Sequence, residues 1–189
     1  NDMIVHSPNW LDLLTAPLHN DPGVGIVGSR LLYEDMTVQH AGIAFNALSR
    51  FPYHIYKGQP GGAPHVMRDR RMTAVTGACM MMRASDWAKL RGFSPIYVNG
   101  SEDIDICLRM SRVLGLKIHY AFGPQILHLE GKSPGRGQHN ILNRLAFLGL
   151  WKEAVSADDA AIYAEDQTAM PAFRANDQTL NPNYRSLEI

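Results

Sequence analysis

The acidic run that begins at Glu102 is the part of the sequence best suited to catalysis. Glu102 and Asp103 are adjacent, and they follow Gly100 and Ser101. The pattern of residues 102–114 predicts a helix, and Ser101 is a favourable N-cap residue for it. Carboxylates in a first helical turn are stabilised by unpaired N–H groups and by the positive end of the helix dipole. A carboxylate that is ionised and fixed in direction in this way suits a general base.

A third acid in the same segment has a partner one helical turn away. Asp105 and Arg109 are four residues apart, so we expect their side chains to pair along the solvated face of the helix. The same features also describe a well-capped helix without any catalytic role. The segment alone therefore leaves both interpretations open, and the rest of the chain has to decide between them.

Histidines and basic residues are the other groups that could take part in chemistry. The chain has 8 histidines, and a single histidine is most often a hydrogen-bonding residue of the core or the surface. That interpretation applies to His40, His54 and His128 when each is taken alone. Lys132 and Arg136 lie in a glycine-rich basic loop, whose simplest interpretation is a solvated surface.

Composition and charge exclude several classes of protein. The 189 residues fit one domain with a sizeable core, and 18 basic residues balance 18 acidic ones. No net field therefore attracts nucleic acid or an anionic membrane. Cys79 and Cys107 lie in apolar runs and have no disulfide framework or zinc-binding spacing. We recognise no secretory signal, and charged residues or glycines interrupt every apolar stretch before it reaches membrane-spanning length.

Strands and helices alternate along most of the chain. Strands are predicted at residues 3–5, 24–28, 72–82 and 116–121, with a hairpin at 30–45. Helices are predicted at residues 8–14, 86–90, 102–114 and 141–155. Ser85 is the predicted cap at the start of the second helix, and Gly115 the left-handed cap that ends the third. Residues 46–71 form a predicted long loop, and residues 156–189 a polar tail or linker.

Several short motifs follow one another in a defined order. They are Asn1-Asp2, Val38-Gln39-His40-Ala41-Gly42, Thr76-Gly77-Ala78-Cys79 with Arg83 and Gly92-Phe93, the segment from Tyr97 to Arg109, and His128-Leu129-Glu130 followed by Ser133 and Arg136-Gly137. Each motif alone is weak, but their order and spacing resemble the C-terminal half of a GT-A-type glycosyltransferase of the large inverting family 2. The resemblance covers about residues 1–140.

This resemblance implies an α/β fold in which helices flank a GT-A-like mixed sheet. Residues 1–155 would form the acceptor and metal side of the domain, and residues 156–189 the polar tail or linker. The nucleotide-binding first half of the family's domain is missing from this chain, as is the first residue of the metal-binding D-x-D motif. We therefore expect the isolated chain to expose a sheet edge, to self-associate and to be inactive.

The resemblance also implies an activity, the transfer of a sugar from a nucleotide-sugar donor to an acceptor hydroxyl with inversion. Asp103 matches the catalytic base of the family, and Glu102 would support it or orient the acceptor. Asp2 and His128 match the ligands of a divalent cation, Mn²⁺ or Mg²⁺, and the nitrogen ligand favours Mn²⁺.

Further residues acquire expected roles from the same resemblance. Lys132 and Arg136 would clamp the donor diphosphate, one as a point charge and the other as a bidentate fork. Gly77, His40 and His54 would line the acceptor site. The acceptor would be a glycan or a lipid-linked molecule in surface-polysaccharide assembly, and the enzyme would be cytoplasmic, at the inner face of the membrane. No nucleic acid partner is expected.

Two other functions stay open at this point. The chain could be a non-catalytic carbohydrate-binding or structural module that keeps the GT-A shell, which would not require Asp2, Asp103 and His128 to converge. It could also belong to a sugar nucleotidyltransferase, which has a similar fold and metal-binding acids. A nucleotidyltransferase would not require a paired acid at the start of a helix so far along the chain.

Overall fold

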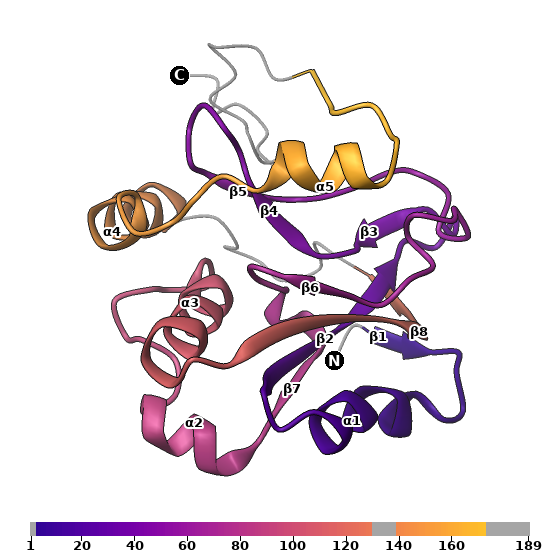
Figure 1. Ribbon diagram of the computed structural model, residues 1–189, viewed down its shortest axis with the longest axis horizontal. Coiled ribbons are helices and arrows are strands. Elements are labelled where there is room, and N and C mark those ends of the chain that lie inside the picture. Colours follow the sequence, from indigo (N-terminus) through magenta and orange to yellow (C-terminus); the bar gives the residue numbers. More distant parts are fainter. Residues whose placement is uncertain (1–2, 130–138, 173–189) are drawn as a thin grey trace.

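The computed structural model describes residues 3–129 and 139–172, which form a mixed sheet with helices around it (Figure 1). Two long strands run parallel at its centre, β2 (Val24–Leu32) and β8 (Lys117–His128). Shorter strands pair with the outer edges of these two: β1 (Met3–Val5), β3 (Val38–His40), β6 (Arg70–Met72) and β7 (Met80–Met82). A separate two-stranded sheet consists of β4 (Ile43–Phe45) and β5 (Pro52–His54).

Each central strand changes its outer neighbour part of the way along its length. β8 pairs with β6 through residues 118–120 and with β1 through residues 126–128. β2 pairs with β7 through residues 26–28 and with β3 through residues 31–32. The carboxyl ends of both central strands therefore lie beside β1 and β3. This end of the sheet carries Gln39 and His40 on β3 and His128 on β8.

Helices cover both faces of the central strands. Every residue of β2 is buried, including Ser29 and Arg30, and burial along the whole length is typical of a strand that has a parallel neighbour and is covered on both sides. Val27 packs in a cluster with residues of α1 (Trp10–Asn20). Ile26, whose side chain points to the opposite face, packs with residues of α3 (Glu102–Leu114).

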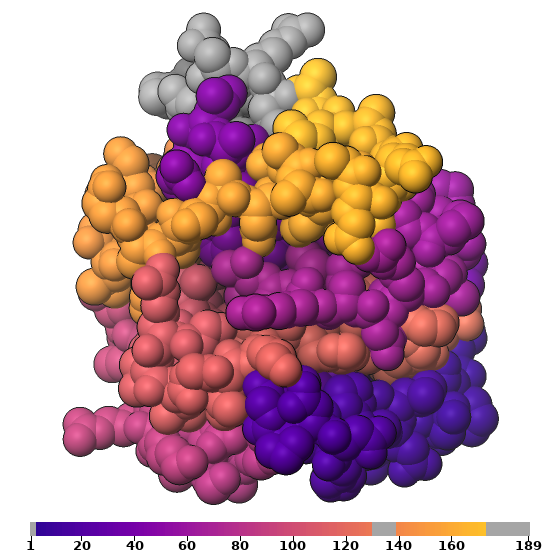
Figure 2. Space-filling view, in the orientation of Figure 1, coloured from indigo at the N-terminus to yellow at the C-terminus, as the bar shows by residue number. Residues whose placement is uncertain are grey.

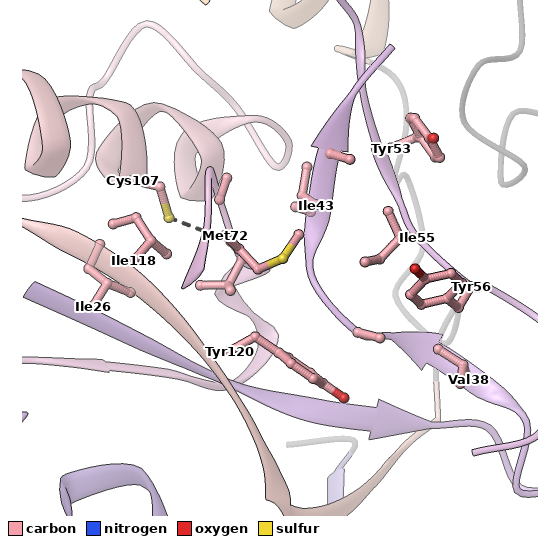
Figure 3. Close-up of a cluster of buried hydrophobic side chains, with 14 of the residues drawn as sticks. Ile26, Val38, Ile43, Tyr53, Ile55, Tyr56, Met72, Cys107, Ile118 and Tyr120 are labelled. Atoms are coloured by element: carbon pink, nitrogen blue, oxygen red, sulfur yellow. Dashed lines mark hydrogen bonds between the residues drawn. The ribbon is translucent and has the colours of Figure 1, made fainter. Parts of the chain in front are cut away.

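The larger apolar cluster lies between α3 and the short strands (Figure 3). Cys107 of α3 faces Ile118 of β8 and Met72 of β6 in this cluster. A Cβ at Gly25 would come within 2.6 Å of the Met110 sulfur, so glycine at this position permits α3 to approach β2 closely. Cys107 and Cys79 are buried and unlinked, which confirms that they are small core residues.

The remaining helices agree in part with the predictions from sequence. The helix at 102–114 and the left-handed conformation of Gly115 are confirmed. α2 (Ala84–Leu90) begins before Ser85, so Ser85 lies inside the helix and is not its cap. α4 (Asn140–Trp151) is shorter than predicted. Within the described residues, no helix is both long enough and apolar enough to span a bilayer.

The predicted single strand at 72–82 is wrong. β6 ends at Met72, β7 begins at Met80, and a short 3-10 helix (Gly77–Cys79) lies between them. The hydroxyl of Thr76 accepts a hydrogen bond from the N–H of Ala78. Local bonds of this kind compete with strand pairing. The predicted loop at 46–71 is also interrupted, because β5 and the start of β6 fall within it.

A polar tail or linker was predicted for residues 156–189, but residues 156–172 contain α5 (Asp159–Glu165), and residues 173–189 lie outside the described residues. α5 packs against the chain that follows β4 and β5 (Figures 1 and 2). Tyr163 is buried in the main apolar cluster, and Asp158 accepts a hydrogen bond of 2.6 Å from the backbone N–H of Phe45. Asp166 forms an ion pair of 2.6 Å with Arg70. Residues 158–166 are therefore an integral part of the fold.

Candidate functional site

Asp103 lies in the first turn of α3, where backbone donors fix its carboxylate. The N–H of Gly77 donates to Oδ2 at 2.7 Å, and the N–H of Ile104 donates to Oδ1 at 2.9 Å. A Cβ at Gly77 would lie 3.0 Å from the Cβ of Asp103, so the absence of a side chain there permits this close approach. The carboxylate is therefore fixed in direction, as a general base requires.

The surroundings of Asp103 also alter its acidity. Partial burial raises the pKa of Asp103, and the negative charge of Glu102 raises it further, while the Gly77 N–H acts in the opposite direction. Burial penalises the charged form of a carboxyl group, which makes the carboxylate a stronger base. A stronger base accepts a proton from a hydroxyl group more readily.

The start of α3 is built differently from the predicted N-cap. Ser101 has φ of 72° and makes no capping hydrogen bond through its side chain, so the prediction that it caps the helix is wrong. Glu102 instead accepts a hydrogen bond from the backbone N–H of Gly100. Asn99 also has a positive φ, of 53°. The chain therefore makes a tight left-handed turn directly before the two acids.

The predicted pair between Asp105 and Arg109 is confirmed, at 2.7 Å, but it does not lie on a solvated face. Asp105 is buried and also accepts a hydrogen bond of 2.9 Å from the indole N–H of Trp151 in α4. Arg109 donates to the backbone carbonyls of Leu90 and Gly92 at the end of α2. This pair therefore joins α3 to the two neighbouring helices and fixes the direction of the helix that carries Asp103.

Asn143 of α4 secures the turn before α3. Its Oδ1 accepts from the N–H of Val98 at 3.0 Å, and its Nδ2 donates to the carbonyl oxygen of Val98 at 2.8 Å. A buried asparagine that satisfies both backbone groups of one residue acts like a neighbouring strand. Sequence reasoning missed this residue, and the only signal is a polar side chain on the inner face of an amphipathic helix.

A pair of histidines lies between the Asp103 region and the end of the sheet. The Nδ1 atoms of His40 and His54 are 3.0 Å apart, and the Nε2 atom of His40 lies 3.4 Å from the N–H of Thr76. His40 is fully buried. Burial lowers the pKa of His40 well below its usual value and lowers the pKa of His54 to about 4. Both rings are therefore neutral near pH 7.

The burial of His40 bears on its predicted role. With no exposed surface, its side chain does not contact an acceptor in this conformation, and it instead hydrogen-bonds to neighbouring protein groups. His54 is only partly buried. Direct contact with an acceptor therefore stays a prediction for Gly77 and His54, and the structure gives His40 a supporting position behind them.

Gln39 and His128 form the second well-defined contact at this end of the sheet. The Nδ1 atom of His128 lies 2.6 Å from Oε1 of Gln39, and Nε2 of Gln39 donates to the carbonyl oxygen of His128 at 3.1 Å. Both residues are buried. In the sequence, Gln39 is noted only as a neighbour of His40 in a short motif. Nothing in its spacing indicates that it holds His128.

Three predicted site residues, Asp2, Lys132 and Arg136, lie outside the described residues. Met3, which follows Asp2 in the chain, pairs with His128 across β1 and β8. Residues 3–129 and 139–172 contain no group of three or more histidine, cysteine or acidic side chains arranged to hold a metal ion. A cation beside His128 would therefore need ligands from outside these ranges or from a bound molecule.

Comparison with known proteins gives a consistent picture. Residues 1–140 match the model of the family described as glycosyltransferase like family 2. The chain is 32% identical to the O-antigen biosynthesis protein RfbC of Myxococcus xanthus over 138 residues, which are 70% of the chain and 11% of that protein. It is 30% identical to the uncharacterized protein y4gI of Sinorhizobium fredii over 139 residues, 71% of the chain and 15% of that protein.

A shorter match and a solved structure complete the comparison. The chain is 38% identical to the rhamnosyltransferase WbbL of Escherichia coli over 52 residues, which are 28% of the chain and 19% of that protein. The crystal structure of GalNAc-T7 with UDP, GalNAc and Mn²⁺ superimposes with a TM-score of 0.55 at 18% identity. The superposition covers 87% of this chain and 32% of the GalNAc-T7 chain. This likeness shows a shared fold, and it confirms the predicted α/β class with a mixed sheet.

Proposed function

The chain belongs to glycosyltransferase-like family 2, and on that premise we propose that it forms the acceptor and metal side of an inverting, metal-dependent glycosyltransferase. One observation carries the proposal. Asp103 is a half-buried carboxylate fixed by the N–H groups of Gly77 and Ile104, and the N–H of Thr76 contacts His40 of β3, at the end of the sheet that bears His128. The first turn of a helix with only a structural role does not require these contacts.

Asp103 acts as the general base in this proposal. Its carboxylate removes the proton from an acceptor hydroxyl, whose oxygen attacks the anomeric carbon of the donor sugar. The bond from that carbon to the diphosphate oxygen breaks on the opposite side, so the configuration inverts. Glu102, held by the Gly100 N–H, orients the acceptor or supports Asp103. Gly77 and His54 line the acceptor side.

His128 is the proposed nitrogen ligand of a divalent cation, together with Asp2. The donor set supports the choice of Mn²⁺ over Mg²⁺, because imidazole nitrogen binds Mn²⁺ better and carboxylate oxygen suits both. The pairing of Met3 with His128 supports the presence of both ligands at one end of the sheet. When bound, such a cation neutralises the charge that develops on the leaving diphosphate. Lys132 and Arg136 are proposed to contact the same diphosphate.

The substrates are proposed at the level of class. The relatives' names favour a nucleotide-sugar donor and a glycan or lipid-linked acceptor in surface-polysaccharide assembly. The chain spans only 11% and 15% of the lengths of the first two relatives, so the activity of the whole protein belongs to the same proposal. We further propose a cytoplasmic location at the inner membrane face, and self-association of the isolated chain through an exposed sheet edge.

The experiment that tests the catalytic role compares Asp103→Asn with the wild type in a transfer assay, with both made in the longer protein of which this chain is proposed to be a part. Release of nucleoside diphosphate is measured with a panel of radiolabelled UDP- and dTDP-sugars and a lipid extract as the acceptor source. Asp103→Asn should lower turnover by about two orders of magnitude or more, with donor affinity nearly unchanged. Asp12→Asn is the matched control, because Asp12 is an exposed acid in the first turn of α1.

Three outcomes would change this proposal. If Asp103→Asn keeps most of the transfer activity, the base lies elsewhere and Glu102 is the first candidate. If the wild type binds sugars but never transfers them, the chain is a non-catalytic module. If the anomeric configuration of the product, read by NMR, is that of the donor, the inverting mechanism is wrong.

A further inference from the structure

We infer that the side chain of Gln39 holds His128 in one tautomer, with its proton on Nδ1 and Nε2 as the acceptor nitrogen. The inference rests on the proposed function of His128 as a metal ligand, and it assigns Gln39 as a positioning residue.

The orientation of the Gln39 amide follows from its contact with the His128 backbone. The carbonyl oxygen of His128 can only accept, so the amide group that lies 3.1 Å from it must be the NH₂ of Gln39. The other end of the amide, Oε1, then faces Nδ1 of His128 at 2.6 Å. Because Oε1 can only accept, Nδ1 of His128 must carry the proton, and Nε2 has the lone pair.

The same reasoning fixes both rings of the histidine pair. The N–H of Thr76 can only donate, so Nε2 of His40 accepts and the proton of neutral His40 is on Nδ1. That proton is donated to Nδ1 of His54, 3.0 Å away. Neutral His54 then carries its proton on Nε2.

Gln39 contacts His128 at two points. Its side chain holds both the ring and the backbone carbonyl of His128. Gln39, His40 and His128 are all buried, so an unsatisfied donor or acceptor among them is costly. A metal-binding histidine characteristically donates its second ring N–H to a fixed acceptor, which sets its tautomer and ring direction.

The contacts of Asp103 are separate from those of Gln39. The N–H of Gly77 holds the Asp103 carboxylate, and the N–H of the preceding residue, Thr76, contacts His40. A change in the Gln39 side chain should therefore act on His128, while the contacts of Asp103 stay in place.

The test reads tautomers directly by long-range ¹H–¹⁵N NMR on the histidine-labelled chain. The wild type should show protons on Nδ1 of His128, Nδ1 of His40 and Nε2 of His54. Gln39→Leu should remove the Nδ1–H preference of His128, and Gln39→Glu, which keeps an acceptor at the same position, should preserve it. Gln59→Leu is the matched control, since Gln59 also contacts a histidine ring, that of His65 at 2.7 Å.

Mn²⁺ binding, followed by electron paramagnetic resonance on the same four proteins, gives the second measurement. Gln39→Leu should weaken Mn²⁺ binding by about 10- to 100-fold, and Gln59→Leu should not change it. A wild type with the proton on Nε2 of His128, or a Gln39→Leu variant with an unchanged tautomer, would overturn the inference that Gln39 sets the tautomer of His128. A folded His128→Ala variant that binds Mn²⁺ like the wild type overturns instead the metal role of His128, because the tautomer spectra do not depend on the metal.

Discussion

The N–H of Gly77 donates to the Asp103 carboxylate at 2.7 Å, and the α-carbon of Gly77 faces the Cβ of Asp103 so closely that a side chain would lie 3.0 Å away. The position of the proposed base is therefore set by a residue 26 positions earlier in the chain. Gly77 belongs to a 3-10 turn between two short strands, whereas Asp103 begins a helix. Their contact makes the 3-10 turn part of the structure that positions the proposed base.

Replacing Gly77 with alanine should therefore displace Asp103. A methyl group 3.0 Å from the Asp103 Cβ forces a shift of a few tenths of an ångström in one of the two backbones. Because catalysis depends steeply on the position of the base, turnover in the transfer assay should fall by about 10- to 100-fold. Gly62→Ala is the control, since a Cβ at Gly62 meets no atom within 4 Å. Equal turnover in both variants would contradict the positional role of Gly77.

The Asp105–Arg109 pair should contribute strongly to stability. Arg109→Ala leaves the buried Asp105 without its charged partner and removes two hydrogen bonds to backbone carbonyls. We expect the free energy of unfolding, measured with urea, to fall by about 3 kcal/mol. The control variant is Lys117→Ala. It removes an ion pair with Asp21 that is about half exposed and should contribute less than about 1 kcal/mol. Similar decreases in the free energy of unfolding in both variants would show that the buried Asp105–Arg109 pair contributes no more than an exposed ion pair.

The stability of the fold should depend on the ionisation of His54. Burial, together with the nearby charges of Lys57 and His128, lowers the pKa of His54 to about 4, compared with about 6.5 in an unfolded chain. Between these values the unfolded chain binds more protons, so this contribution is complete above pH 6.5 and is lost as the pH falls toward 4. The free energy of unfolding should decrease by about 2 kcal/mol through this window.

A variant is needed to isolate this contribution, because the raised pKa values of Asp103 and Asp158 act in the opposite direction as the pH falls. In metal-free buffer, His54→Asn should unfold with a smaller loss of stability between pH 6.5 and 4 than the wild type. His19→Asn, at an exposed histidine of α1, should follow the wild-type curve. Parallel curves for wild type and His54→Asn would contradict the prediction.

α5 should be necessary for full stability, although the sequence after Ser156 is polar. Tyr163→Ala removes a buried aromatic ring that packs against Tyr56 at a centroid distance of 5.0 Å. We expect the free energy of unfolding to fall by about 3–5 kcal/mol. Glu165→Ala, in the same helix, removes only an exposed ion pair with Arg68 and should cost less than about 1 kcal/mol. A Tyr163→Ala variant as stable as Glu165→Ala would mean that α5 is only loosely attached.

The sequence is informative where local chemistry determines the structure. α3 has a 3.6-residue pattern, acids at its start and a glycine that takes the left-handed conformation at its end, so its bounds could be predicted. The first part of β2, residues 24–28, is an apolar run, and β2 proved to be a central strand. Asp103 was identified from its place in this helix together with the family resemblance, and its role as the base is still a prediction.

Contacts between distant segments could not be predicted in the same way. The left-handed turn at Asn99–Ser101 is stabilised by Asn143, which lies more than 40 residues later. Ser101 therefore does not cap the helix, even though it has the preferred residue type. Nor does any local pattern indicate that Gln39 contacts His128, because that contact depends on the arrangement of β3 and β8 in the sheet. Because residues 156–166 are largely polar, they did not indicate that α5 belongs to the fold. Asp158 and Asp166 have their partners in other parts of the fold, which the local sequence does not show.

The pairing of β1 with β8 has a consequence for how the protein folds during synthesis. Met3 pairs with His128, so the segment that contains Met3 must wait for about 125 further residues before its partner strand exists. At roughly 5–20 residues per second, this delay is about 6–25 seconds. During that time β1 has no neighbour in the sheet, and contacts of such large sequence separation form late and slowly. The end of the sheet that bears His128 is therefore among the last parts to assemble, which makes it the part most exposed to chaperones and to mispairing with other chains.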